Sequence, residues 1–329
     1  MVRSSPTDDS MQLSPVQRRI RDFYFKDGVT APPEVTHVHR TALVPDQQLF
    51  SLAHLRRHLN DPLLDLDYLN LFEGGKPVDL SSARLYKLVQ KRKIGFVDKR
   101  VLQAHFERGA ACVLEGLDIL EPDINTLATA LDRGAAATFC NATAFFSQQG
   151  NEAYRGHVDT DDVLVIHMAG EKRWTLHKRQ PPRRVNLADL EPAHMGPVDA
   201  EIVMRPGDVL YLRNYVPHRV ATLSPYSLHV SFDLCNRQTS IEAALQLLLR
   251  HYDRDSSPRE TPPLADLDKL HQLSRTPAFA ADLANVQAGE DAGQAEFREL
   301  LATNRITFLD RLLHADRAAT PVTSTDKRT

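Results

Sequence analysis

The chain has 329 residues, of which 42% are hydrophobic and 25% are charged. This is ordinary globular composition, and the length allows one large or two modest domains with a sizeable core. The formal net charge of -3 gives no electrostatic reason to expect nucleic acid as the main partner, although it does not exclude a local basic patch.

The cysteine content and the hydropathy of the chain indicate the cellular compartment in which the protein works. Cys112, Cys140 and Cys235 are widely spaced and form no CxxC pair, so neither a disulfide framework nor a thiolate zinc site is indicated. No apolar run is long enough to span a membrane, and the first residues lack the apolar segment of a secretory signal. We therefore expect a cytoplasmic protein without a membrane partner, with a flexible leader over residues 1–13.

Residues 14–136 are expected to form a helix-rich N-terminal part. Ser14 is a good N-cap and Pro15 a good first helical residue, so a helix is predicted from this point. Three more segments have apolar residues at helical spacing or end in Gly, as helices often do. The segment "ACVLEGL" indicates one short strand. The three helical segments are "FSLAHLRRHLN", "DKRVLQAHFERG" and "EPDINTLATALDRG".

Residues 137–236 change to short β-rich runs separated by Gly, Pro, Asn and Asp. Many short strands at close spacing favour a small sandwich or barrel over a βαβ fold. The predicted runs are "ATFCNATAFFSQ", "DVLVIHMAG", "KRWTLHK", "AEIVMRPGD", "VLYLRN", "HRVATL" and "SLHVSFDL". Helical spacing returns over 237–316, where apolar stripes suggest a homodimer surface, and 317–329 are expected to be disordered.

A chemical constellation lies in the β-rich segment. His157 and Asp159 flank one residue just before an apolar run, and alternate side chains of a strand share a face. His218 follows "PGDVLYLRNYVP" near the start of another predicted strand. Two imidazoles and one carboxylate on one side of an ion leave the other positions open, as in non-haem Fe(II) oxygenases.

A cation is predicted in the same barrel. Lys172 lies past the predicted turn "MAGEK", on a strand expected to return antiparallel to residues 163–166. An ammonium held inside a barrel needs an anion, which a dicarboxylate co-substrate would supply. The alternative is that Lys172 is a solvated turn residue, and the alternative for the H-x-D pair is a capped surface turn.

The segments "HVD", "GEKRW", "PGDVLYLRNYVPH" and "SLHVSF", in this order and spacing, resemble the JmjC-domain oxygenases that depend on 2-oxoglutarate and Fe(II). The similarity is greatest to the cupin-like branch that includes ribosomal-protein hydroxylases. It implies an α+β fold with a double-stranded β-helix core of the jelly-roll type, N-terminal helices and a C-terminal helical region.

The resemblance also implies roles for individual residues. His157, Asp159 and His218 would hold Fe(II), and Lys172 would pair with the distal carboxylate of 2-oxoglutarate, with O₂ as the other co-substrate. Asn141 would lie near the carboxylate on the metal side. Thr143 and Ser231 would lie beside the distal carboxylate, at positions where the family often has Tyr and Thr.

Further residues flank the expected opening of the site and are candidates for substrate contact. His229 shares a face with Ser227 and Ser231 in an alternating strand, and a supporting hydrogen-bond role is an equal alternative for it. Trp174, the sole tryptophan, is expected to belong to the core. The other substrate-pocket candidates are Tyr154, Arg155, Arg213, Asn214 and Tyr215.

The functional expectation is hydroxylation of an unactivated C–H bond, most readily on a protein or peptide side chain. A hydroxylase of a small biosynthetic metabolite is the first alternative. A non-redox cupin that binds metal as a sensor or structural module is an alternative of a different class, and such a site would close its coordination with protein ligands. No hydrolase triad or phosphate-binding glycine loop is present.

Overall fold

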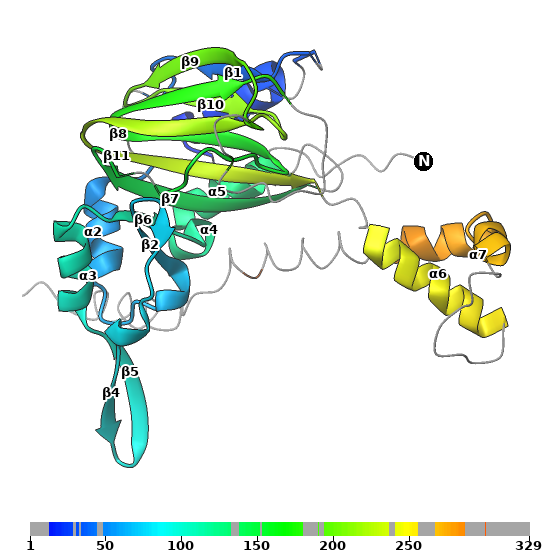
Figure 1. Ribbon diagram of the computed structural model, residues 1–329, viewed down its shortest axis with the longest axis horizontal. Helices are drawn as coiled ribbons and strands as arrows, with labels where there is room; N and C mark the ends of the chain where they lie inside the picture. The colour runs from blue at the N-terminus through cyan, green and yellow to red at the C-terminus, as the bar shows by residue number, and fades with distance from the viewer. Residues whose placement is uncertain are drawn as a thin grey trace, which may run out of the picture.

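A curved antiparallel sheet forms the centre of the protein in the computed structural model (Figure 1). The structure describes residues 13–28, 31–32, 34–44, 49–132, 138–151, 153–179, 190, 194–236, 241–255, 267–286 and 300. The predictions for the tail 317–329, and for all of the leader except Leu13, lie outside the described residues.

Within the described residues this sheet has nine strands. Their order is β1-β10-β8-β11-β7-β6-β2-β3, and β9 pairs with β8 beside this path. The strands are β1 (His37–Arg40), β2 (Leu69–Glu73), β3 (Lys76–Pro77), β6 (Ala111–Leu114), β7 (Thr138–Gln148), β8 (Asp162–His177), β9 (Val198–Met204), β10 (Val209–Leu212) and β11 (His218–Asn236).

Strands β8 and β11 run the length of the barrel and pair with each other at both ends. The predicted turn at "MAGEK" is wrong, because residues 162–177 form one strand that carries both Val163 and Lys172. The register with β11 shifts between the pairs at Thr222 and Ser227, and Gly170 has a positive φ of 72°. This irregularity bends the strand without ending it.

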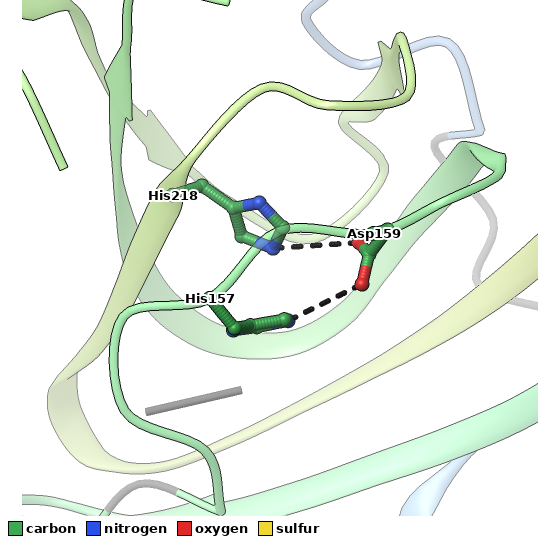
Figure 2. Close-up of side chains that lie close together, drawn as sticks. All are labelled: His157, Asp159 and His218. Atoms are coloured by element: carbon green, nitrogen blue, oxygen red, sulfur yellow. Dashed lines mark ion pairs between the residues drawn. The ribbon is translucent and has the colours of Figure 1, made fainter. Parts of the chain in front are cut away.

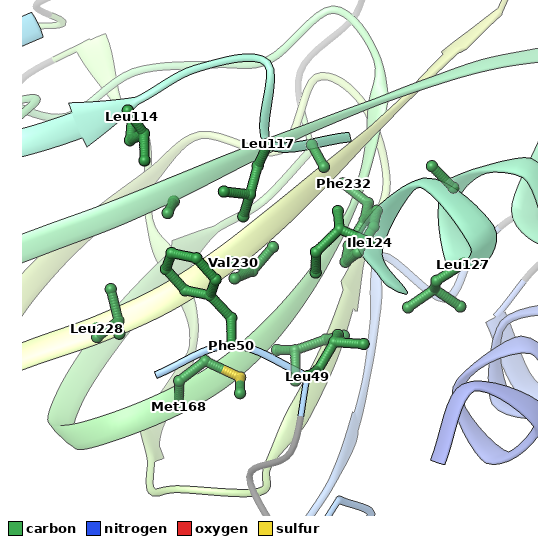
Figure 3. Close-up of a cluster of buried hydrophobic side chains, with 14 of the residues drawn as sticks. Leu49, Phe50, Leu114, Leu117, Ile124, Leu127, Met168, Leu228, Val230 and Phe232 are labelled. Atoms are coloured by element: carbon green, nitrogen blue, oxygen red, sulfur yellow. The ribbon is translucent and has the colours of Figure 1, made fainter. Parts of the chain in front are cut away.

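Alternation along the strands separates two apolar clusters. Leu164 and Ile166 face a large cluster outside the barrel, whereas Val163 and Val165 face a smaller one inside it. Figure 3 shows part of the outer cluster, where Phe50, Leu117 and Ile124 lie against Val230 and Phe232 of β11. One face of each strand thus packs against the helices of the N-terminal part, and the opposite face lines the interior of the barrel.

The predicted helices of the N-terminal part are present. Ser14 caps α1 (Pro15–Phe23) in a capping box with Gln17, and Pro15 is its first residue. The other helices are α2 (Leu52–Asn60), α3 (Lys99–Glu107), α4 (Leu117–Leu120) and α5 (Pro122–Asp132), with a π-turn over Tyr24–Gly28 and 3₁₀ turns over Leu66–Tyr68 and Ser81–Ala83.

The N-terminal part also contains strands that the sequence analysis did not predict. β1, β2 and β3 join the main sheet, and β4 (Arg84–Val89) and β5 (Arg92–Val97) form a separate hairpin. These strands are short, and the hairpin turn at Gln90–Lys91 lacks the Asn-Gly signal of such turns. In Figure 1 the hairpin projects away from the sheet and its helices.

The predicted helical return after the barrel begins with α6 (Ile241–Asp255) and α7 (Leu267–Leu273). Leu247 and Leu248 of α6 pack with Phe279 in a small cluster of their own, beside the barrel in Figure 1. The helical segments predicted beyond residue 286 lie outside the described residues, apart from position 300. In the described part of the chain, no helix is long and apolar enough to cross a membrane.

Candidate metal centre and its cavity

His157, Asp159 and His218 come together at one end of the barrel. Their ligand atoms all lie within 4.8 Å of one another. Asp159 Oδ1 is 3.5 Å from His157 Nε2, and Asp159 Oδ2 is 3.6 Å from His218 Nε2. Figure 2 shows both imidazole rings directed at the carboxylate. The arrangement predicted from the H-x-D pair and the distant histidine is therefore formed.

The backbone holds this group in place. His157 lies in the loop before β8, and its N–H and C=O form a two-bond bridge with His218 at the first residue of β11. The N–H of Tyr215 donates to the carbonyl of Asp159 at 2.9 Å. Two segments far apart in sequence are thereby joined at the position where their side chains meet.

Each histidine presents Nε2 to the shared point because its Nδ1 is occupied. His157 Nδ1 lies 2.9 Å from the Arg155 carbonyl, and His218 Nδ1 lies 3.0 Å from the Val216 carbonyl. A carbonyl accepts a hydrogen bond from Nδ1–H, which fixes the tautomer and leaves the Nε2 lone pair free for a metal. Burial and the neighbouring His157 lower the pKa of His218, so its imidazole is neutral.

Fe(II) fits this donor set. Two imidazole nitrogens and one carboxylate oxygen are ligands that Fe(II) accepts in the open three-ligand arrangement. The group lies at the wall of a cavity of about 1120 Å³, so one side of the ion would face open space. Within the described residues, no further His, Cys, Asp or Glu joins the group to close the coordination.

Lys172 lies in the same cavity, with only 5% of its surface exposed. It lies on the inner face of β8, opposite Thr222 of β11. His229 Nδ1 accepts a hydrogen bond from the ammonium at 3.1 Å. Burial and the charge of Lys172 lower the pKa of His229 well below its usual value, so this ring is neutral and can accept.

Three hydroxyl groups form a cluster that includes Thr222, the residue opposite Lys172 in the β8–β11 ladder. Ser147, Thr222 and Ser227 are buried, and their oxygens lie 2.8 to 3.2 Å apart in a closed triangle. Ser147 also lines the cavity. A cavity lined by a buried ammonium and a hydroxyl group suits a carboxylate, so the residues present fit the distal end of 2-oxoglutarate.

Three residues assigned by resemblance also line the cavity: Asn141, Thr143 and Ser231. Thr143 of β7 is directly opposite Ser231 of β11, and Asn141 is opposite Asp233. The Asn141 side chain donates to Cys235 Sγ at 3.7 Å. Thr143 and Ser231 thus share the cavity with Lys172, as the resemblance implied.

The substrate-pocket candidates separate into two groups. Tyr154 and His229 line the cavity, and the Tyr154 ring centroid is 5.6 Å from that of His157. Arg155 supplies its carbonyl to His157, and its side chain lies against Gly75. Tyr215, with a φ of 58°, contributes its backbone N–H to Asp159.

The expectation for Arg213 and Asn214 needs correction. Arg213 donates from Nε to the carbonyl of Val35 at 2.7 Å, and the Asn214 side chain accepts a hydrogen bond from Arg179. Among the described residues that line the cavity, neither is present. Nearness in sequence to His218 suggested them, but the turn after β10 directs them to the outside of the sheet.

Two residues of the cavity were not predicted as functional. Trp174 is buried and stacks on His218 with centroids 5.4 Å apart, and its Nε1–H has no partner among the described residues. Asp233 lines the cavity from β11. The alternation in "SLHVSFDL" carries the signal, since Asp233 continues the series of Ser227, His229 and Ser231 on the inner face.

Asp233 gives a testable pH dependence of stability. Burial, and next the charges of Asp159 and Asp161, raise its pKa to about 7. A carboxyl group whose folded pKa exceeds its unfolded pKa makes the protein less stable as pH rises from the unfolded value through the folded one. Asp233→Asn is therefore expected to raise the free energy of unfolding more at pH 8 than at pH 5, by a difference on the order of 2 kcal/mol.

Urea denaturation at both pH values measures this difference. Exposed Glu34 provides the matched control, because Glu34→Gln removes one carboxylate without a burial effect. An equal gain for Asp233→Asn at the two pH values would mean that the Asp233 carboxyl titrates normally.

Comparisons with known proteins agree with this architecture. Residues 121–242 match the family described as JmjC domain. This part of the chain is similar to JmjC domains. The match begins at the residue before α5 and runs through the metal group, Lys172 and all of β11. It confirms the JmjC resemblance and the expected α+β fold with a double-stranded β-helix core.

Curated proteins that are similar to this chain share a low sequence identity with it. A bifunctional lysine-specific demethylase and histidyl-hydroxylase NO66 of Aedes aegypti is 26% identical over 98 residues, which are 28% of this chain and 15% of that protein. The Drosophila melanogaster protein of the same name is 25% identical over 134 residues, 37% of this chain and 20% of its own length. The chain thus matches only a small fraction of these relatives.

Solved structures show the same fold. Escherichia coli ycfD superposes with a TM-score of 0.51 at 15% identity, covering 78% of this chain and 68% of that one. A structure of the ribosomal oxygenase YcfD in complex with cobalt and 2-oxoglutarate gives 0.50 at 15% identity, covering 76% and 66%. At this identity the comparison establishes the fold alone.

Proposed function

We propose that this JmjC protein is a 2-oxoglutarate- and Fe(II)-dependent oxygenase that hydroxylates a C–H bond of a protein or peptide side chain. The observation that carries the proposal is one cavity holding both the His157, Asp159 and His218 group and the buried ammonium of Lys172. The names of the similar proteins, a histidyl-hydroxylase and a ribosomal oxygenase, support a protein substrate.

Each part of the cavity has a defined task in this proposal. His157, Asp159 and His218 would hold Fe(II), which with 2-oxoglutarate and O₂ supplies the oxidising chemistry. Lys172 and the neighbouring hydroxyl groups orient the co-substrate by its distal carboxylate. The apolar walls, including Phe145 and Trp174, keep water away from the reacting face.

The charge of the cavity favours a cationic substrate group. Glu115, Asp118 and Asp233 line it together with Asp159, whereas Lys172 is the sole lysine or arginine among its described lining residues. The Lys172 charge would be matched by the co-substrate. The remaining acidic residues would attract a basic side chain and repel a small anionic metabolite.

Oligomeric state and location are also part of the proposal. Leu245 and Leu249 of α6 are 54% and 38% exposed, which supports a homodimer through the C-terminal helices. The three cysteines are free thiols, which supports a reducing, cytoplasmic setting.

The proposed activity is tested with the whole chain and a panel of peptides. Anaerobic addition of Fe(II) and 2-oxoglutarate should produce the visible charge-transfer band of chelation, and air should then release succinate. Peptides with a central Arg, Lys or His should accelerate succinate formation and gain the mass of one oxygen, whereas Ala and Glu peptides should not. Iron binding without a band and without succinate would contradict the oxygenase and favour a non-redox cupin.

A further inference from the structure

The β4–β5 hairpin is exposed on both faces. It forms a sheet of its own and projects from the body of the protein (Figure 1). Large apolar side chains on an exposed hairpin are not stabilised by burial, so their presence indicates a surface that binds another molecule. The side chains concerned are Tyr86, Leu88, Ile94 and Phe96, with exposed fractions of 59%, 70%, 47% and 44%.

The hairpin is also strongly basic. Residues 84–97 include five Lys or Arg and no Asp or Glu, in a chain whose net charge is -3. Arg84 at the base is paired with Asp67 at 3.0 Å. Among the described residues, the other four cations, Lys87, Lys91, Arg92 and Lys93, have no ion pair. The last three are consecutive and lie at the tip.

The turn at the tip is held in a costly conformation. Gln90 and Lys91 both have positive φ, 47° and 67°. A two-residue turn of this type usually contains Asn and Gly, because other residues pay a steric cost there. Gln and Lys instead place two long polar side chains at the outermost point of the hairpin.

One face of the hairpin combines a ring with a cation. Tyr86 lies opposite Gly95, where the absence of a side chain leaves room for the ring against the strand, and a Cβ at Gly95 would lie 3.6 Å from it. The Lys93 ammonium is 6.0 Å from the centre of the Tyr86 ring. The ring is therefore held against the strand beside a positive charge, and more than half of its surface is open.

We propose that the β4–β5 hairpin is a docking surface for single-stranded RNA. The cations at the tip would contact phosphates, and Tyr86, on the same face as Lys93, would stack on an unpaired base, while Phe96 offers a second ring on the other face. Unpaired bases are exposed in RNA loops and hidden in duplex DNA, which favours RNA. The net charge of -3 argues against nucleic acid binding over the whole surface. The hairpin is a local basic patch on this acidic chain.

The position of the charges argues against a membrane. The cations occupy the tip, whereas Tyr86 and Phe96 lie nearer the base. Insertion of the hairpin into a bilayer would bury the charges first, which is the costly order. An acidic protein would meet the same cations, and the experiment includes it as a competing outcome.

The test is fluorescence anisotropy of a labelled oligouridylate with the full chain across a salt series. The logarithm of the binding constant should fall linearly with the logarithm of salt. Replacing Lys91, Arg92 and Lys93 together by Gln should make this slope less steep by about 2, since each contact with a single-strand phosphate contributes about 0.7. Tyr86→Leu should weaken binding on the order of tenfold and leave the slope unchanged.

Two controls keep the result specific. Arg19→Gln removes an exposed cation from α1 and should change neither affinity nor slope. Thermal melting of each variant should match the wild type, because the substituted side chains of Tyr86, Lys91, Arg92 and Lys93 lie outside both the metal group and the main core.

Several outcomes would overturn the proposal. One is the absence of RNA binding, and another is an unchanged slope in the triple variant. Tighter binding of duplex or single-stranded DNA would exclude RNA as the partner. Displacement of the RNA by a polyglutamate peptide that binds equally well would assign the surface to an acidic protein instead.

Discussion

Asp159→Ala is expected to abolish metal binding and turnover together. Asp159 lies between the two histidine Nε2 atoms at 3.5 and 3.6 Å and is the sole carboxylate of the group. Its removal leaves two neutral imidazoles, which neither balance the charge of a divalent ion nor complete the three-ligand face. Affinity should fall by more than about 100-fold, since even the loss of a supporting partner costs 10 to 100-fold.

Titration with Co(II), followed by absorption spectroscopy and by calorimetry, measures this loss independently of turnover. Asp161→Asn is the matched control, because Asp161 is in the same loop and does not belong to the group. Retention of Co(II) binding by Asp159→Ala would mean that the metal lies elsewhere or uses other ligands.

Lys172→Met is expected to remove 2-oxoglutarate binding while leaving the metal in place. The ammonium is buried, with a neutral histidine as its recorded hydrogen-bond partner, so Met fills the same space without a charge. Loss of one partner from a buried charge pair costs 2 to 5 kcal/mol, so the dissociation constant and KM for 2-oxoglutarate should rise on the order of 100-fold. The ligand-free variant should be no less stable than the wild type, because it no longer buries a charge.

Arg173→Met provides the matched control for this prediction. Arg173 is the next residue of β8, exposed on the opposite face of the strand. Its replacement should change neither 2-oxoglutarate binding nor Co(II) binding. Normal co-substrate affinity in Lys172→Met would place the distal carboxylate at another group and contradict the assignment.

Much of the site could be predicted from sequence because strand alternation is local information. The runs from Asn141 to Ser147 and from Ser227 to Asp233 show their inner faces directly as every second residue. His218 could be predicted as the third ligand beside His157 and Asp159 from the three-ligand pattern alone, without a model of the chain between them. The helices of the N-terminal part carried their own caps and stop signals.

The remaining features depend on tertiary structure. The bend at Gly170 looks like a turn in sequence, because a glycine followed by charged residues commonly ends a strand. The β4–β5 hairpin lacks a favoured turn, and lysine and arginine interrupt its apolar residues, so no clear periodic signal identifies it. Arg213 and Asn214 are near His218 in sequence but belong to a turn that faces outward, and only the coordinates separate the two sides.

The pairing of β8 with β11 has a consequence for co-substrate choice. His218 is opposite Leu176 and Thr222 is opposite Lys172, so the metal ligand and the ammonium are anchored on adjacent strands four residues apart in one hydrogen-bonded ladder. Their spacing along the strands, about 13 Å between backbone positions, is fixed by the ladder and does not vary with loop movement. With His218 on the metal and Lys172 on the distal carboxylate, as proposed, this fixed span would favour a diacid of one length over homologues that are a carbon shorter or longer.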